Sequence, residues 1–160
     1  MKTLTEAEAY NRLAARCAAA EQCRSDLAAR LYRWGIASAQ AACLLDRLEQ
    51  EGYIDAERYC RAFANDRIRF AGWGRNKVTQ ALRAKQLPAE CIAQALDEAD
   101  ADNYEEQLRH LLAAKRRSLH GEPHTHWAKL MRYGTGRGFE AGLVARILAE
   151  TGLDQDYEEP

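Results

Sequence analysis

The apolar positions of this chain recur about every 50 residues, and this repetition constrains the fold more than any other feature. Shifting the sequence by 51 and then by 52 residues aligns the apolar positions in four columns. The columns are Leu27, Val78 and Leu130; Ile36, Leu87 and Phe139; Ala41, Ile92 and Val144; and Leu45, Leu96 and Leu148. Chance matches between amphipathic helices are the alternative. Because the columns run through all three segments, we favour a tandem repeat.

Each third of the chain has room for three short helices. Capping and helix-breaking residues predict helices over 5–19, 26–35, 39–52, 56–70, 75–85, 88–99 and 103–117, then one from 125 and one over 140–150. Thr5 and Glu8 have the spacing of a capping box, and Asn103 with Glu106 predicts the start of the seventh helix. Strong helix formers abound and β-branched residues never alternate over the length of a strand, which predicts an all-α fold.

We therefore expect an all-α protein of three tandem three-helix repeats in an elongated array. The predicted repeats are residues 1–54, 55–101 and 102–160, the last with an acidic C-terminal tail. A repeat of about 50 residues has a thin core, so neighbouring repeats are expected to contribute to each other's burial. A long surface of this kind suits an extended partner.

The composition is that of a folded protein, with 47% hydrophobic and 29% charged residues. The N-terminus lacks the apolar core of a signal peptide, and no apolar run approaches the roughly 18 residues of a membrane span. The five cysteines form no CxxC pair, which predicts reduced, mostly buried thiols in a cytoplasmic protein without a membrane partner. One reactive thiol is the alternative.

Residues 67–85, RIRFAGWGRNKVTQALRAK, form a basic stretch without an acidic residue. Its cations are Arg67, Arg69, Arg75, Lys77, Arg83 and Lys85. The chain as a whole has 23 basic and 24 acidic residues, but the acids gather elsewhere, six of them in residues 97–106 and four in residues 154–160. A solvated helix face is the simplest interpretation of the basic stretch. The segregation of charge by sign favours a contact with phosphates or with an acidic protein surface.

Further basic residues follow in the last third of the chain. They are Lys115, Arg116 and Arg117 at the end of the seventh predicted helix, and Lys129, Arg132 and Arg137 beyond it. The candidate contact residues for a protein or DNA partner are therefore Arg67, Arg69, Arg75, Lys77, Arg83, Lys85, Lys115, Arg116, Arg117, Arg132 and Arg137. The sequence leaves open whether the acidic tail masks these residues when no partner is present.

Other classes of function find little support in the residues. The helix over 88–99 would be the recognition helix of a helix-turn-helix, but residues 88–100 have four acids and no Lys or Arg to read base edges. Glycine-rich phosphate loops and common hydrolase motifs are missing. His120, His124 and His126 lie near Glu122 without a strong metal-site spacing, so neither a metal nor another cofactor is expected. Trp73 could stack on a base or cover a boundary between repeats.

The segment from Glu51 to Leu87 resembles the RecX regulatory proteins of bacteria. The resemblance rests on Gly52-Tyr53-Ile54-Asp55, Glu57-Arg58-Tyr59, Arg61-Ala62-Phe63, Gly74, Lys77-Val78, Ala81-Leu82 and Lys85, and on Arg137-Gly138-Phe139 near the end. It covers nearly the whole chain, although AGWG differs from the more basic turn of many members. Tyr53, Ile54, Phe63 and Phe139 are expected to be core and turn residues.

The resemblance implies a non-enzymatic regulator that binds the RecA filament on single-stranded DNA and inhibits the recombinase. It also implies roles in homologous recombination, DNA repair and the SOS response, and direct contact with single-stranded DNA is expected to be weak or indirect. We expect a monomer. A helical module that binds DNA phosphates without RecA is the main alternative, and a metal-dependent enzyme at the histidines is a remote one.

Overall fold

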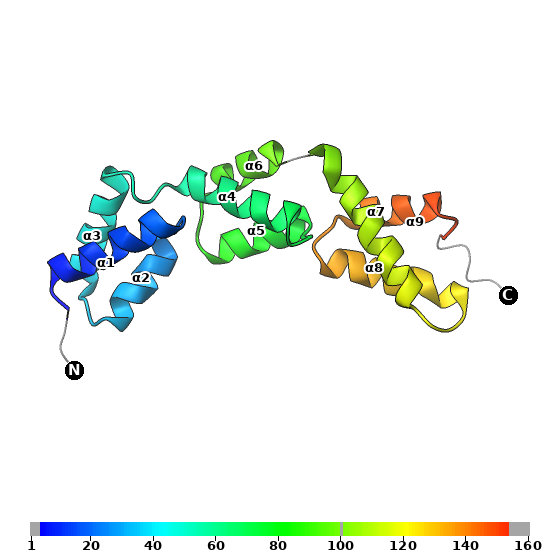
Figure 1. Cartoon of the computed structure of the whole chain (residues 1–160), viewed down its shortest axis with the longest axis horizontal. Helices are drawn as coiled ribbons and strands as arrows, with labels where there is room; N and C mark the ends of the chain where they lie inside the picture. The colour runs from blue at the N-terminus through cyan, green and yellow to red at the C-terminus, as the bar shows by residue number, and fades with distance from the viewer. Residues whose placement is uncertain (1–3, 100, 154–160) are drawn as a thin grey trace. The chain divides into compact units, whose positions relative to one another are not determined.

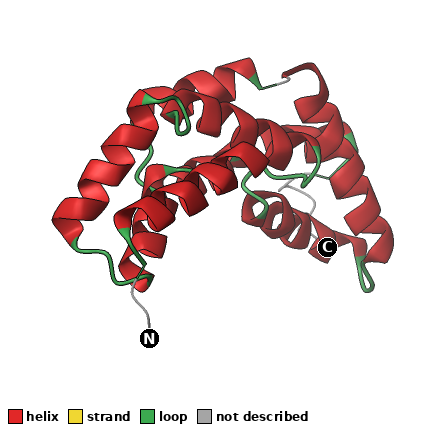
Figure 2. Cartoon of the chain, turned by 60° about the vertical axis from the view of Figure 1, so that its left-hand side comes forward, coloured by secondary structure: helices red, strands yellow, loops and turns green. Residues whose placement is uncertain are grey.

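The structure is a computed structural model that describes residues 4–99 and 101–153. Its described segments are helices joined by short loops (Figure 2), which confirms the all-α prediction for this part of the chain. Figure 1 labels the α-helices and colours the chain from its N-terminus to its C-terminus. They are α1 (Glu6–Ala19), α2 (Arg24–Arg33), α3 (Ser38–Gln50), α4 (Ala56–Arg69), α5 (Arg75–Ala84), α6 (Ala89–Glu98), α7 (Ala101–Ser118), the 3-10 turn η1 (Pro123–Thr125), α8 (His126–Gly136) and α9 (Ala141–Glu150). The predicted acidic tail, residues 154–160, lies outside the described residues.

Side-chain caps are present at the starts of α1 and α4, whereas α2, α3, α8 and α9 begin without one. The Thr5 side chain accepts a hydrogen bond from the Glu8 N–H, and the Glu8 carboxylate accepts one from the Thr5 N–H, which confirms the capping box. The predicted start of the seventh helix at Asn103 is wrong, because α7 already begins at Ala101. Ala has the highest helix propensity, so the helix continues N-terminally beyond Asn103.

The turn between the second and third helix has the same backbone geometry in each repeat. One residue of the turn has a positive φ, and the next donates its N–H to the carbonyl five residues earlier, as in a Schellman motif. The positive-φ residues are Gly35, Gln86 and Gly138, at 77°, 64° and 98°. The N–H donors are Ile36 to Leu31, Leu87 to Leu82 and Phe139 to Gly134, at 3.0 to 3.1 Å. The spacing of 51 and 52 residues therefore recurs in the structure.

The aligned apolar columns supply the core. Leu27, Val78 and Leu130 are each fully buried, and the other columns are buried or half-buried throughout. These observations confirm three-helix repeats. The boundaries of the repeats at residues 54/55 and 101/102 stay a prediction.

The contacts of the chain divide it into two compact units. Unit 1 comprises Met1–Ala62 and Leu82–Ala95, and unit 2 comprises Phe63–Ala81 and Leu96–Pro160. The second predicted repeat contributes residues to both units. The basic stretch is divided in the same way, since Arg67, Arg69, Arg75 and Lys77 belong to unit 2 while Arg83 and Lys85 belong to unit 1.

Unit 1 has an apolar core from its first three helices. Leu13 of α1, Leu27 and Leu31 of α2, and Leu48 of α3 are completely buried. Each such side chain contributes roughly 1.5–3 kcal/mol by leaving water. Tyr10 closes the edge of this core, since its hydroxyl donates to the Glu51 carboxylate. Tyr53 and Ile54, both expected to be core or turn residues, differ in burial. Ile54 is buried, whereas Tyr53 is exposed and its ring meets the Tyr10 ring edge-on.

Unit 2 has a second core between α7, α8 and α9. Its buried side chains are Leu108 and Leu112 of α7, Leu130 of α8, Phe139 of the following turn, and Val144, Ile147 and Leu148 of α9. Gly134 allows α8 and α9 to approach closely, because a Cβ atom there would lie 2.8 Å from a Val144 methyl. Phe139 is 1% exposed, as predicted for a core residue.

The cysteines are free thiols, and most of them avoid solvent. Cys23 and Cys60 are buried, Cys17 and Cys91 are half-buried, and Cys43 is exposed. Burial raises the pKa of the Cys60 thiol to about 11, with smaller contributions from Cys91 and Cys23. The prediction of mostly buried thiols is thus met fully only at Cys23 and Cys60.

A search of the helices in residues 4–99 and 101–153 found none with the length and apolar character needed to cross a membrane.

Candidate partner-binding surface

Two turns of unit 2 that are distant in sequence pair through their backbones. The Gly74 N–H, just before α5, donates to the Arg137 carbonyl over 2.8 Å, and the Asn76 N–H donates to the Gly138 carbonyl over 2.9 Å. A Cβ atom on Gly74 would lie 2.2 Å from the backbone of Gly138 and Phe139. This pairing, which we call the joint, therefore requires glycine at position 74.

Gly138 is constrained from the other side of the joint. Its φ is +98°, and a Cβ atom there would lie 2.3 Å from Cβ of Lys77. Only glycine satisfies both the left-handed backbone and the close approach. The AGWG turn and the Arg137-Gly138-Phe139 turn, which the sequence singled out separately, are thus two halves of one structure.

Arg137 completes the joint with its side chain. Its Nε donates to the Gly72 carbonyl over 3.0 Å, and its Nη2 donates to the Ala71 carbonyl over 2.7 Å. These carbonyls follow the C-terminus of α4, where a cation is favoured by the helix dipole. The structure thus gives this candidate contact residue an internal structural role.

A group of polar contacts, which we call the polar link, connects Tyr104, Arg75 and Glu140 next to the joint. The buried Tyr104 hydroxyl accepts the Arg75 N–H over 3.0 Å and donates to Glu140 over 2.6 Å. The Arg75 guanidinium lies 4.1 Å from the centre of the Tyr104 ring and 3.4 Å from Glu140. Burial and the hydrogen bond to Glu140 raise the pKa of Tyr104. Arg75 is therefore largely satisfied within unit 2.

Trp73 lies between aromatic and basic side chains. Its ring meets Phe63 edge-on at 6.1 Å, while the Arg67 guanidinium is 5.2 Å and the Lys77 ammonium 4.4 Å from its centre. Trp73 and Phe63 are half-buried. The ring thus packs within its own unit and has two cations of the basic stretch beside it, and its covering of a boundary between repeats stays a prediction.

Phe70 is the functional candidate that the sequence analysis missed. It follows the last residue of α4, and 78% of its surface is exposed. Arg69, its neighbour in sequence, is also exposed. The helical period of the sequence could have predicted this exposure. Ala64 and Ile68 lie on the buried side of α4, and Phe70 lies about 200° around the helix from Ile68. An exposed aromatic ring beside cations is a typical contact for single-stranded nucleic acid.

The two cations of the basic stretch in unit 1 differ from each other. Lys85 forms a 2.8 Å ion pair with Asp26 of α2, whereas Arg83 is exposed on α5.

The basic residues of the last third all lie in unit 2. Lys115 is 5.4 Å from the centre of the Tyr133 ring. Arg116, Arg117 and Arg132 are exposed, and the Arg132 Nε donates to the Ala128 carbonyl over 3.4 Å. Of this group, Arg137 alone belongs to the joint.

The side chains of His120, His124 and His126 are not arranged as a metal-binding site. His120 and His124 are exposed and His126 is half-buried at the start of α8. Among the described residues, no group of three or more His, Cys, Asp or Glu side chains is placed to hold a metal ion.

Comparison with known proteins gives one consistent family. Residues 55–96 match the model of the second three-helix domain of RecX. Regulatory protein RecX of Thermus thermophilus is 38% identical over 121 residues, which cover 76% of this chain and 73% of that protein. Regulatory protein RecX of Pseudomonas fluorescens is 29% identical over 134 residues, covering 84% and 85% of the two chains.

Solved structures show the same fold. A crystal structure of regulatory protein RecX superposes with a TM-score of 0.79 at 20% identity, covering 90% of this chain and 71% of that one. RecX from Lactobacillus salivarius gives a TM-score of 0.77 at 16% identity, covering 92% and 96%. The helical repeats, the sequence relatives and these structures agree, and the chain belongs to the RecX family of regulatory proteins.

Proposed function

We propose that this protein is a non-enzymatic, monomeric, cytoplasmic regulator that binds the RecA filament on single-stranded DNA and inhibits the recombinase. Family membership supports the regulatory role, and the resemblance to RecX proteins supplies the partner. The observation that carries the proposal is the exposed Phe70 ring beside Arg69, at the end of α4. With Arg67, Trp73 and Lys77 these residues form what we call the aromatic–basic segment.

The chemistry of the aromatic–basic segment suits a filament that presents both DNA phosphates and protein. Arginine and lysine side chains contact phosphates or carboxylates, and an exposed aromatic ring stacks on an unpaired base or enters an apolar pocket. The segment is held in place by its backbone. The Trp73 N–H donates to the Arg67 carbonyl over 2.9 Å, and Gly74 is fixed in the joint.

Further contacts are proposed for candidate residues with exposed side chains, namely Arg83, Arg116, Arg117 and Arg132. Lys115 lies beside Tyr133 and is half-buried. Arg75, Lys85 and Arg137 have internal partners, so a contact to RecA or DNA would have to share or replace these bonds.

The test is the single-stranded-DNA-dependent ATP hydrolysis of RecA, with this protein titrated in. Binding to the same DNA without RecA is measured at the same salt concentration. We compare the wild type with Arg69→Glu/Phe70→Ala. Tyr32→Ala/Arg33→Glu is a matched control, because it removes an adjacent exposed aromatic and cation from α2 of unit 1, where Tyr32 is 83% exposed.

We expect wild-type protein to inhibit at concentrations too low to coat the DNA, and the Arg69/Phe70 variant to need at least about tenfold more protein. The control should inhibit like the wild type. Inhibition that begins only when bare DNA is saturated would instead favour a DNA-binding module that acts without RecA. Equal inhibition by both variants and the wild type would refute the role of the aromatic–basic segment.

A further inference from the structure

A groove in unit 2 has an apolar floor and a partly basic rim. Its floor is formed by Ala113 of α7, which is exposed, and by the core side chains Leu112, Leu130, Ile147 and Leu148 behind it, which are at most 3% exposed. Its rim carries Arg109, Arg116 and Arg117 from α7, with Glu150 and Thr151 at the end of α9. The volume of this open groove is about 690 Å³, which is large enough for several side chains.

The cations of the rim are in different electrostatic situations. Arg109 is neutralised, because its guanidinium lies 3.2 Å from Glu150 and 3.5 Å from both Glu105 and Glu106. The guanidinium groups of Arg116 and Arg117 make no hydrogen bond or ion pair with any residue that the structure describes. Arg116 follows Arg109 by seven residues, or about 10.5 Å along the same face of α7. The groove is therefore positive at one end.

The described chain ends beside this groove. Thr151 lines it, and Leu153 is anchored by its N–H, which donates to the Leu148 carbonyl over 2.9 Å, and by its buried side chain. Seven residues follow, DQDYEEP, with four carboxylates and one aromatic ring, that of Tyr157. Fully extended, they reach about 23–25 Å, which exceeds the distance between Arg109 and Arg116 along α7.

We propose that this groove binds the chain's own acidic tail, residues 154–160. In this arrangement Tyr157 packs on the exposed part of the floor at Ala113, and the carboxylates of the tail pair with Arg116 and Arg117. The length and starting point of the tail and the complementary charge support this occupant. A tethered segment acts at a millimolar effective concentration, so individually weak contacts suffice for occupancy. The inference is independent of the proposed function, because its test involves neither RecA nor DNA.

Nuclear magnetic resonance of the full-length, 15N-labelled chain provides the test. The readout is the backbone heteronuclear NOE of residues 154–159, together with contacts between the Tyr157 ring and the methyl group of Ala113. The groove variant is Arg116→Glu/Arg117→Glu. The matched control is Lys129→Glu, an exposed cation of α8 that does not line the groove. A charge swap adds Asp156→Lys/Glu158→Lys to the groove variant.

We expect an ordered tail in the wild type and in Lys129→Glu, a random-coil tail in the groove variant, and recovery in the charge swap. Addition of 0.5 M salt should weaken the order, since exposed ion pairs are screened. A random-coil tail in the wild type would overturn the proposal, as would an ordered tail in the groove variant. Order that disappears on dilution would also overturn it, because the occupant would then be the tail of a second copy.

Discussion

Arg137 and Gly72 are joined by a hydrogen bond although they lie 65 residues apart in the sequence. The Arg137 Nε donates to the Gly72 carbonyl over 3.0 Å, while Nη2 of the same guanidinium donates to the Ala71 carbonyl over 2.7 Å. The last carbonyls of a helix and those just beyond it have no intrahelical donor. The chain after α4 thus depends on a side chain from the turn after α8, which ties two predicted repeats together within unit 2.

Replacing Arg137 should therefore destabilise unit 2. We expect Arg137→Ala to lower the free energy of unfolding by about 1.5–3 kcal/mol, as is typical for lost hydrogen bonds to a charged group. Arg137→Lys should recover only part of this loss, because an ammonium group lacks the planar fork that reaches two carbonyls. Urea unfolding followed by circular dichroism measures the effect. Arg132→Ala is the control, and a similar loss there would argue against a specific role for Arg137.

The joint predicts a strong requirement for Gly74. Its Cβ substituent would lie 2.2 Å from backbone atoms of Gly138 and Phe139, which cannot move as a flexible side chain can. We expect Gly74→Ala to cost about 3 kcal/mol or more, which places it in the severe class of single substitutions.

Gly142→Ala is the matched control for Gly74, because a Cβ atom there meets nothing within 4 Å in α9. That change should be neutral or should stabilise by up to about 1 kcal/mol through helix propensity. The melting temperatures of both variants and of the wild type, measured by thermal unfolding, test this prediction. A Gly74→Ala protein with the wild-type melting temperature would contradict the geometry of the joint.

The polar link at Tyr104 predicts a cost at neutral pH and a distinct response to alkaline pH. At neutral pH, Tyr104→Phe should cost about 1–2 kcal/mol, because the Arg75 N–H and the Glu140 carboxylate lose a partner. The pKa of Tyr104 is raised above its ordinary value of 10.0 in the folded state. Above about pH 10 the unfolded chain releases a proton that the folded chain keeps, so this contribution to stability declines as pH rises.

Urea unfolding at pH 8, 10 and 11 tests this sign. The wild type should lose stability more steeply than Tyr104→Phe over this interval, because other titrating groups are common to both proteins. Parallel declines in the two proteins would show that Tyr104 does not titrate differently on unfolding.

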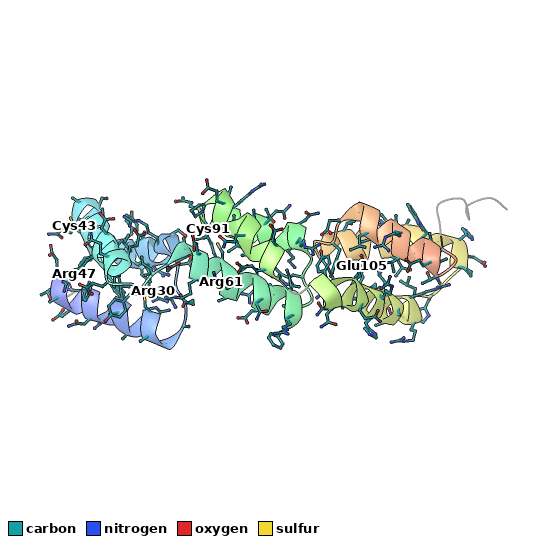
Figure 3. The ribbon with its side chains drawn as sticks, turned by 90° about the horizontal axis from the view of Figure 1, so that it is seen from above. Arg30, Cys43, Arg47, Arg61, Cys91 and Glu105 are labelled. Atoms are coloured by element: carbon teal, nitrogen blue, oxygen red, sulfur yellow. The ribbon has the colours of Figure 1, made fainter. Side chains whose placement is uncertain are left out.

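The thiols should differ in reactivity according to their exposure. Cys43 projects from α3 in Figure 3 and is exposed, whereas Cys60 is completely buried and its pKa is raised to about 11. The thiolate is the reactive form. With a colourimetric disulfide reagent at pH 8, we expect one fast phase that disappears in Cys43→Ser. Cys60 should react only under unfolding conditions, and fast labelling of Cys60 in the native protein would contradict its burial.

Local sequence determined the helices and the repeated turn. Helix-forming residues separated by glycines and capping residues need only neighbours in the chain, which is why the capping box at Thr5 and the columns that include Leu27 and Val78 could be predicted. The apolar columns also predicted much of the core, because burial of apolar side chains follows the 3.6-residue period. The start of α7 was missed, since a local cap at Asn103 competes with the high helix propensity of Ala101.

The tertiary structure alone decided what each cation contacts. Charge along the sequence made Arg69, Arg75, Lys85 and Arg137 equivalent, but folding placed Arg75 beside Glu140, Lys85 beside Asp26 and Arg137 at the end of α4. The partners lie 59 to 66 residues away in the chain, so no local pattern identifies them. Because an ion pair or hydrogen bond depends on distance in space, the sequence could supply the charges but only the packing of distant turns could assign them.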